Sequence, residues 1–203
     1  SSFILMKKGL EVYSYTQVAA LRLFIAFLSL LPFIFHAFKK VAKKHWMPII
    51  ITAFLGNGIP AFLFAKAQTQ LDSSFVGILD AITPLLTLLL GMYFFKLIPT
   101  KKNILGIMIG LIGAFILSAS TSNGNLTINS YSLFVVLATL FYAISINITK
   151  KYLADLDPIY ISVLCYLFVG PVSGIYVFNS DFIPLVNSYG GINALIYITL
   201  LAI

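Results

Sequence analysis

The feature that most constrains this chain is a series of apolar runs, each long enough to cross a lipid bilayer as a helix. A helix rises about 1.5 Å per residue, so about 20 apolar residues cover a hydrocarbon core about 30 Å thick. Only short polar links separate the runs, and a soluble domain could not bury so many of them. Six complete spans are expected, at 17–38, 46–66, 74–95, 103–120, 131–150 and 159–178. The pattern predicts an all-α, polytopic transmembrane helix bundle.

The composition agrees with a protein surrounded mostly by lipid. Hydrophobic residues make up 60% of the chain and charged residues 9%, against about 45–50% and 25% in soluble domains. The formal net charge of +7 does not indicate nucleic-acid binding, because the basic residues lie at the ends of apolar runs. Cys165 is the single cysteine, which excludes an internal disulfide and a cysteine-based metal cluster. We expect no metal and no cofactor.

The basic residues predict the orientation of the spans. If successive spans alternate in direction, three lysine-bearing sites share one face of the membrane. Cytoplasmic loops carry an excess of Lys and Arg, so this face is expected to be cytoplasmic. The residues concerned are Lys39, Lys40, Lys43, Lys44, Lys101, Lys102, Lys150 and Lys151.

Both ends of the chain carry apolar pieces, 1–6 and 192–203, that are too short to span a bilayer alone. We therefore expect each end to be cut inside a helix. A signal-peptide remnant is the alternative for the first piece. However, Lys7 and Lys8 follow its apolar residues, whereas the basic residues of a signal peptide precede them.

An internal repeat predicts two related halves. Residues 2–10 and 145–153 align at an offset of 143 positions (150 − 7). Five spans, counting the cut first helix, fall within this offset. Because five is odd, the second half must enter the membrane in the opposite orientation, as in inverted-repeat transporters. We expect the two units at 1–120 and 131–203; chance similarity between apolar segments is the alternative.

Five segments together resemble the EamA-type members of the drug/metabolite transporter superfamily, over essentially the whole chain. They are SSFILMKKGL (1–10), AALRLFIA (19–26), FVGILDAITPL (75–85), GIMIGLIGA (106–114) and FYAISINITKKYL (141–153). The resemblance implies ten helices in two inverted five-helix repeats, of which this chain holds helices 2 to 7 and parts of helices 1 and 8. It also implies cytoplasmic termini, a bacterial inner membrane and export of amino acids or other metabolites.

Asp80 is the first candidate functional residue. It lies about eight residues into its span, hence about 12 Å deep, and a carboxylate cannot reach the interface from there. Ionisable groups at this depth are functional by default, so Asp80 is a candidate proton-coupling group; a neutral acid hydrogen-bonded to another helix is the alternative. Pro84 is expected to remove a backbone hydrogen bond near Asp80. Similar proteins often carry a neutral residue such as Asn at this position.

Polar and aromatic residues on two further helices are candidates for lining a substrate cavity. Asn57 lies in the segment GNGIP, whose glycines and proline weaken a helix as in discontinuous transporter helices. An interhelical hydrogen bond is the alternative role for this amide. In the family that the chain resembles, the helix at 131–150 contributes to the central cavity. The predicted cavity residues are Asn57, Phe64, Asp80, Tyr142, Ser145 and Asn147.

Other residues within the spans have structural interpretations. Arg22 has a stem long enough to carry its guanidinium to the outer interface, and Lys66 lies close to a helix end. Both are therefore expected to be interface anchors; a substrate ligand is the alternative role for Lys66. Small residues at every fourth position permit another helix to approach closely. Gly106 and Gly110 have this spacing and Gly113 extends the pair, and we expect all three to serve packing.

These patterns favour a transporter that exposes a central site alternately to each side of the membrane. The expected partners are the lipid bilayer and a small-molecule substrate; protons and a second copy of the chain are further candidates. An intramembrane enzyme is one alternative, but the sequence has no HExxH motif, no second intramembrane Asp and no convincing Ser/His pair. A membrane receptor is the other, and the inverted repeat argues against it.

Overall fold

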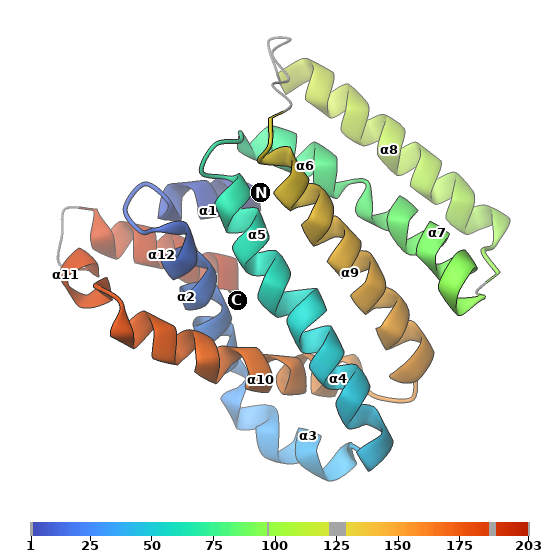
Figure 1. The fold of residues 1–203 in the computed structure, drawn as a ribbon, viewed down its shortest axis with the longest axis horizontal. Coiled ribbons are helices and arrows are strands. Elements are labelled where there is room, and N and C mark those ends of the chain that lie inside the picture. Colours follow the sequence, from blue (N-terminus) through green and yellow to red (C-terminus); the bar gives the residue numbers. More distant parts are fainter. Residues whose placement is uncertain (1, 97, 122–128, 187–189, 203) are drawn as a thin grey trace.

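The computed structural model describes residues 2–96, 98–121, 129–186 and 190–202, with the side chains of 114, 115 and 117–121 left out (Figure 1). Every regular element among these residues is a helix. Five helical segments are long and apolar enough to cross a membrane, and each end lies within three residues of the sequence-based prediction. They are Tyr15–Lys40, Lys43–Ala67, Ser73–Phe95, Ser132–Tyr152 and Pro158–Asn179. The predicted all-helical, multi-pass architecture is therefore confirmed at this level.

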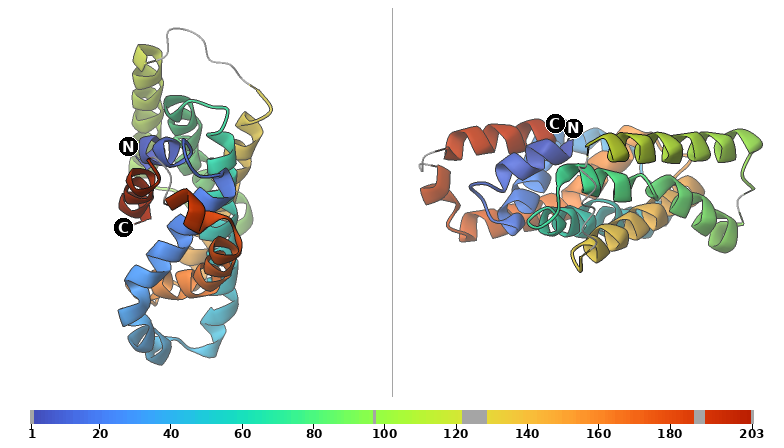
Figure 2. Two further views of the ribbon diagram at one scale, coloured as in Figure 1. Left: turned by 90° about the vertical axis from the view of Figure 1, so that its left-hand side faces the viewer. Right: turned by 90° about the horizontal axis from the view of Figure 1, so that it is seen from above.

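The sixth predicted run falls in α8 (Lys101–Thr121), a helix of 21 residues, part of whose side chains lie outside the described residues. The apolar end pieces form α1 (Ser2–Gly9) and α12 (Gly191–Ala202), which lie side by side (Figures 1 and 2). A five-residue helix, α11 (Phe182–Val186), precedes α12. The ten-helix count and the inverted repeat stay predictions.

The first two spans each contain several helical segments. Ser14 starts the first span with a capping box, in which its side chain and that of Gln17 bond each other's backbone N–H. This span comprises α2 (Tyr15–Leu30), the 3₁₀ turn η1 (Leu31–Phe33) and α3 (Ile34–Lys40). The second comprises the 3₁₀ turn η2 (Lys43–His45), α4 (Trp46–Thr52), the π-helical segment η3 (Ala53–Gly58) and α5 (Ile59–Ala67).

The π-helical segment lies where the sequence predicts a weak helix. Pro60 has no N–H to donate, and the Ile59 N–H bonds the carbonyl of Phe54, five residues earlier. The glycines let two other helices approach this segment. A Cβ added at Gly58 would lie 3.2 Å from Val169 Cγ1, and one added at Gly56 would meet Ser145 Oγ. The span therefore continues through the glycines with a wider turn.

The third span is interrupted beside Asp80. Helix α6 (Ser73–Asp80) ends at that residue, and α7 (Thr83–Phe95) begins after Ala81 and Ile82. Pro84 occupies the first turn of α7, where a missing N–H is tolerated. Asp80 therefore lies at a helix end in the middle of a span, consistent with the expected effect of Pro84.

The most extensive helix packing in the described structure joins α2 to α10 (Pro158–Asn179). A Cβ added at Gly174 would lie 2.6 Å from the Phe24 ring, and one added at Gly170 would meet Phe27. This pair has the small-xxx-small spacing that permits close approach. By contrast, a Cβ at Gly106, Gly110 or Gly113 would meet no described atom within 4 Å. The close packing predicted for these three glycines is therefore not formed in the described part of the chain.

The three lysine-rich sites lie at one end of the bundle. Lys44 Nζ and His45 Nε2 lie 2.9 Å and 3.1 Å from Asp155 Oδ2, which joins the link after α3 to the link after α9 (Ser132–Tyr152). Lys151 Nζ lies 5.4 Å from the Phe95 ring centroid, at the end of α7. These contacts bring together links far apart in sequence, as the alternating topology requires.

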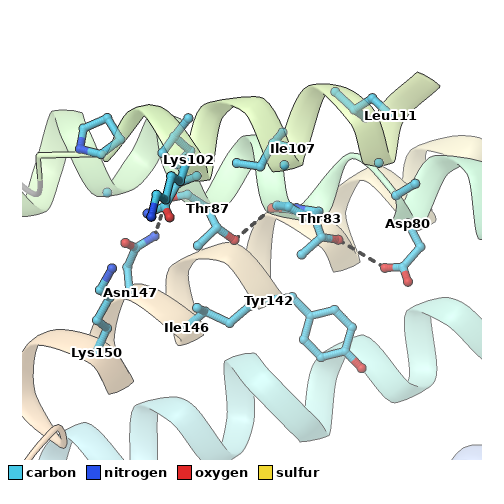
Figure 3. Close-up of a pocket in the computed structure, with 18 of the residues that line it drawn as sticks. Asp80, Thr83, Thr87, Lys102, Ile107, Leu111, Tyr142, Ile146, Asn147 and Lys150 are labelled. Carbon is cyan, nitrogen blue, oxygen red and sulfur yellow. Dashed lines mark hydrogen bonds between the residues drawn. The ribbon is translucent and has the colours of Figure 1, made fainter. Parts of the chain in front are cut away.

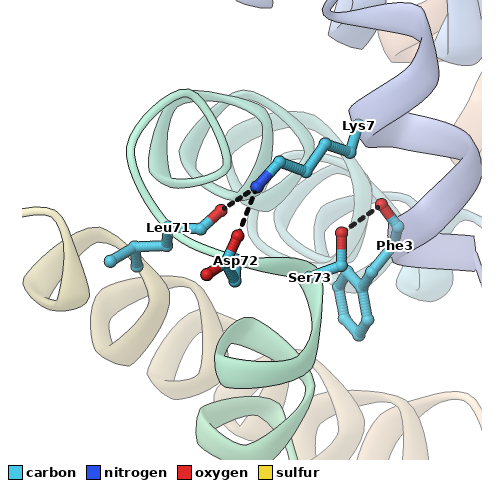
Figure 4. Close-up of polar contacts among 5 residues, drawn as sticks. All are labelled: Phe3, Lys7, Leu71, Asp72 and Ser73. Carbon is cyan, nitrogen blue, oxygen red and sulfur yellow. Dashed lines mark hydrogen bonds and ion pairs between the residues drawn. The ribbon is translucent and has the colours of Figure 1, made fainter. Parts of the chain in front are cut away.

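A second ion pair ties elements together at the other end. Lys7 Nζ lies 2.7 Å from Asp72 Oδ1 and donates to the Leu71 carbonyl at 3.3 Å (Figure 4). The Ser73 hydroxyl donates to the Phe3 carbonyl at 3.1 Å. These bonds hold α1 against the start of α6.

Candidate functional site

A cavity of about 950 Å³ lies between α6, α7, α8 and α9 (Figure 3). Asp80 and Tyr142 line one part of it, and Lys102, Asn147 and Lys150 line another. Residues of α7, α8 and the link between them form most of the remaining walls. Gly106 and Gly110 are among the α8 residues that line the cavity, so the face predicted to pack against a helix borders open space instead.

A row of hydrogen bonds follows the wall that α7 contributes. Thr83 Oγ1 donates to Asp80 Oδ1 at 3.1 Å, and Thr87 Oγ1 donates to the Thr83 carbonyl at 2.8 Å. Asn147 Nδ2 donates to the Thr87 carbonyl at 2.9 Å and to the Ala143 carbonyl at 2.8 Å. Polar groups therefore run from Asp80 along α7 to α9, as the dashed lines of Figure 3 show.

Thr83 and Thr87 were not among the residues predicted from the sequence. The signal was present, because they follow Asp80 at spacings of three and seven and therefore share its helical face. Threonine hydroxyls usually bond the carbonyl one turn earlier, as Thr87 does. Thr83 instead bonds Asp80, because the helix is interrupted between them.

The six predicted cavity residues do not share one cavity. Asp80, Tyr142 and Asn147 line the 950 Å³ cavity. Phe64 is buried, and its ring centroid lies 5.7 Å from that of Tyr142, so it supports the wall from behind. Ser145 is buried against Gly56. Asn57 lines a separate cavity of about 380 Å³, together with Thr52, Thr149 and Cys165.

Comparison with known families identifies the chain. A sequence model described as the EamA-like transporter family matches residues 1–119, more than half of the 203 residues. The chain belongs to the EamA-like transporter family. No curated protein and no solved structure gives a match. Membership implies a membrane transporter with a lipid bilayer around it and a small-molecule substrate, and members of this family are generally not enzymes.

In this EamA-like chain the charged side chains that line the cavity lie apart from one another. Asp80 is the acidic lining residue, and Lys102 and Lys150 are the basic ones; none of the three forms an ion pair with a described residue. Among the described residues, no three His, Cys, Asp or Glu side chains come together as a metal site requires. The cavity wall therefore presents one carboxylate, two ammonium groups, hydroxyls and amides.

One charge cluster outside the spans contains an acidic residue whose pKa is shifted. The hydrogen bond from Lys44 holds the pKa of Asp155 below its ordinary value, and the hydrogen bond from His45 adds to this effect. A charged partner stabilises the ionised carboxylate, so the group stays negative to lower pH. This cluster lies at the lysine-rich end and connects the first half of the chain to the second.

Proposed function

We propose that this EamA-like protein exports small metabolites or amino acids by alternating access, with Asp80 as the proton-coupling group. The observation that carries the proposal is the position of Asp80, at a helix interruption inside a span and on the wall of a 950 Å³ cavity. Interrupted helices place backbone and side-chain polar groups at transporter binding sites. A carboxylate at this depth can alternate between protonated and charged forms as the cavity changes access.

The membrane orientation is part of the proposal. The lysine-rich end is cytoplasmic by the charge bias of membrane loops, in a bacterial inner membrane. Lys102 and Lys150 lie at this end, so the cavity runs from the cytoplasmic side toward Asp80. We further propose that 131–203 begins a second, inverted unit. The family match over 1–119 supports a first repeat unit at 1–120, as expected from the sequence.

The experiment is resistance to toxic amino acids and metabolites in cells that produce the protein, followed by radiolabelled efflux of each hit. We expect efflux that collapses when an uncoupler removes the proton gradient. Asp80→Asn keeps an oxygen that accepts from Thr83 but cannot carry a charge. It should insert normally and lose coupled efflux to the background level. Undiminished efflux from the folded variant would exclude Asp80 as the coupling group.

A further inference from the structure

The smaller cavity, of about 380 Å³, does not include Asp80. The end of α4, the π-helical segment η3 and the last turn of α9 contribute polar side chains to its wall. The link after α9 and the first turns of α10 contribute apolar side chains, among them Leu153, Leu156 and Ile161. Small-molecule sites have volumes of about 300–1,000 Å³. The cavity is therefore large enough to hold a small organic molecule.

Four polar side chains on this wall have no partner among the described residues. Thr52 is the most informative, because it is only 6% exposed and its hydroxyl oxygen is buried without a hydrogen bond. A buried hydroxyl without a partner destabilises the fold unless a water molecule or a ligand bonds it. The other three side chains without a described partner are those of Asn57, Thr149 and Lys150.

The other polar groups in and near the cavity already have partners. Ser162 Oγ and Cys165 Sγ each donate to a backbone carbonyl, at 3.0 Å and 3.7 Å. No acidic residue lines the cavity within the described part of the chain. Of the two acids in the adjoining link, Asp155 pairs with Lys44 and Asp157 bonds the first turn of α10. The free groups on the wall are therefore hydroxyls, an amide and an ammonium group, all of which donate hydrogen bonds.

Helix packing brings two of these groups to one level. A Cβ added at Gly56 would meet Ser145 Oγ, so these two residues face each other. The second span and α9 run in opposite directions (Figure 1). One turn closer to the lysine-rich end, Thr52 and Thr149 therefore lie at the same level on the facing sides of the two helices.

The π-helical segment adds the amide to the same wall. Each residue of an α-helix turns by about 100°, so Thr52 and Asn57, five residues apart, would point about 140° apart. Hydrogen bonds in a π turn join residues five apart, and the wider turn of η3 brings these two side chains toward one side. Single π turns inside α-helices are frequent at functional sites.

Donors that surround one space fit an oxyanion, because charged oxygens accept the strongest hydrogen bonds. Lys150 supplies one positive charge, which balances a carboxylate but not a phosphate monoester, whose charge is about −1.5 to −2 at neutral pH. A lipid head group stays at the interface, whereas the Thr52 hydroxyl is buried inside the bundle. The apolar part of the wall fits a carbon skeleton.

We propose that this cavity binds a small molecule with one carboxylate group and a short apolar skeleton, held by Thr52, Asn57, Thr149 and Lys150. The site is distinct from the cavity that Asp80 lines, although Lys150 borders both. It does not depend on the export function proposed above.

Binding is measured on the purified, full chain in phosphatidylcholine nanodiscs, because a ligand that binds only the folded state raises the melting temperature. The probes are benzoate with benzamide and hexanoate with hexanamide, pairs in which an amide replaces the carboxylate. We expect at least one carboxylate to bind about tenfold or more tightly than its amide. In Lys150→Gln the two members should bind within about twofold of each other. Lys151→Gln is the matched control, because this ammonium lies near the Phe95 and Tyr152 rings, and it should keep the preference.

A second variant locates the ligand and covers the case in which Lys150→Gln fails to fold. Thr52→Val replaces an unpartnered buried hydroxyl by a methyl group, so it should fold and weaken carboxylate binding about tenfold. Thr139→Val is the matched control, since the buried Thr139 hydroxyl already donates to the Val136 carbonyl, and it should leave binding unchanged. Weaker binding in Thr87→Val with unchanged binding in Thr52→Val would place the ligand in the wider cavity and overturn the proposal.

Two further outcomes would contradict the site. If neither carboxylate outbinds its amide in the unmodified protein, the cavity holds only water. If phosphatidylglycerol in the nanodiscs raises the melting temperature of the unmodified protein but not of Thr52→Val, the occupant is a lipid head group and not a small carboxylate. None of these measurements uses efflux, so a failure of the export function leaves the site standing, and a failure of the site leaves the export function standing.

Discussion

At the scale of single residues, Asn147 connects the cavity wall to the rest of the bundle. It is almost fully buried, and its amide bonds the Thr87 carbonyl of α7 as well as the Ala143 carbonyl of its own helix. A buried amide that bridges two helices orients both of them. Asn147 therefore serves both the packing of the bundle and the cavity, because the bond that it makes to α7 also holds Thr87 on the cavity wall.

We expect Asn147→Ala to weaken the contact between α9 and α7 by about 0.6 kcal/mol, the average for an interhelical hydrogen bond in membranes, and by no more than about 1.7 kcal/mol. Asn179→Ala is the control for the bond within a helix, because exposed Asn179 bonds the Ile175 carbonyl of its own helix. Reversible unfolding in detergent micelles measures both. Equal losses for the two variants would show that the bond to Thr87 adds no stability.

At the scale of helices, glycine pairs with the same spacing have different neighbours. Gly170 and Gly174 of α10 lie against phenylalanine rings of α2, whereas Gly106 and Gly110 of α8 line a cavity. Helix α8 runs along the edge of the described structure (Figure 2), with exposed apolar side chains such as Leu105 and Ile109. Small residues permit close packing but do not require it.

Gly174→Ala should destabilise the protein by about 1–3 kcal/mol, because the added methyl group would overlap the Phe24 ring unless that ring moves. Gly110→Ala is the control and should change stability by less than about 0.5 kcal/mol. Thermal unfolding of the two variants gives the comparison. A loss at Gly110 as large as that at Gly174 would mean that another chain or segment packs on that face, as the sequence pattern predicts.

At the scale of the whole molecule, Asp155 joins links that are more than a hundred residues apart. The Lys44 hydrogen bond lowers the pKa of Asp155 from its ordinary value of 3.8. A carboxyl group whose pKa is lower in the folded state than in the unfolded state stabilises the fold above its ordinary pKa. This stabilisation is lost as the pH falls from about 4 toward the lower folded-state value.

We therefore expect Asp155→Asn to lower the melting temperature at pH 7, and we expect this difference to shrink as the pH falls below about 4. Asp181→Asn is the control, since the Asp181 side chain makes no hydrogen bond or ion pair with a described residue. Melting curves between pH 7 and pH 3 test this. A difference between Asp155→Asn and the unmodified protein that is as large at pH 3 as at pH 7 would contradict the linkage.

The orientation of the whole molecule is a separate prediction. A cysteine in Lys40→Cys, at the lysine-rich end, should not react with an impermeant reagent added outside intact cells. One in Asp181→Cys, after the far end of α10, should react. The native Cys165 is buried and should give a low background. Reversed labelling would place the lysine-rich end outside and overturn the proposed direction of transport.

The sequence by itself determined the spans, because a bilayer demands a continuous apolar run and internally satisfied backbone hydrogen bonds. Both requirements are local, so hydropathy located five spans to within three residues. The loss of a backbone hydrogen bond near Asp80 was also expected, because the missing N–H of Pro84 is a local property. The residues that meet across the bundle depend on helix rotation and packing, which hydropathy does not encode. Only the tertiary structure separated Asn57 from Asp80 and placed Gly106 and Gly110 beside a cavity.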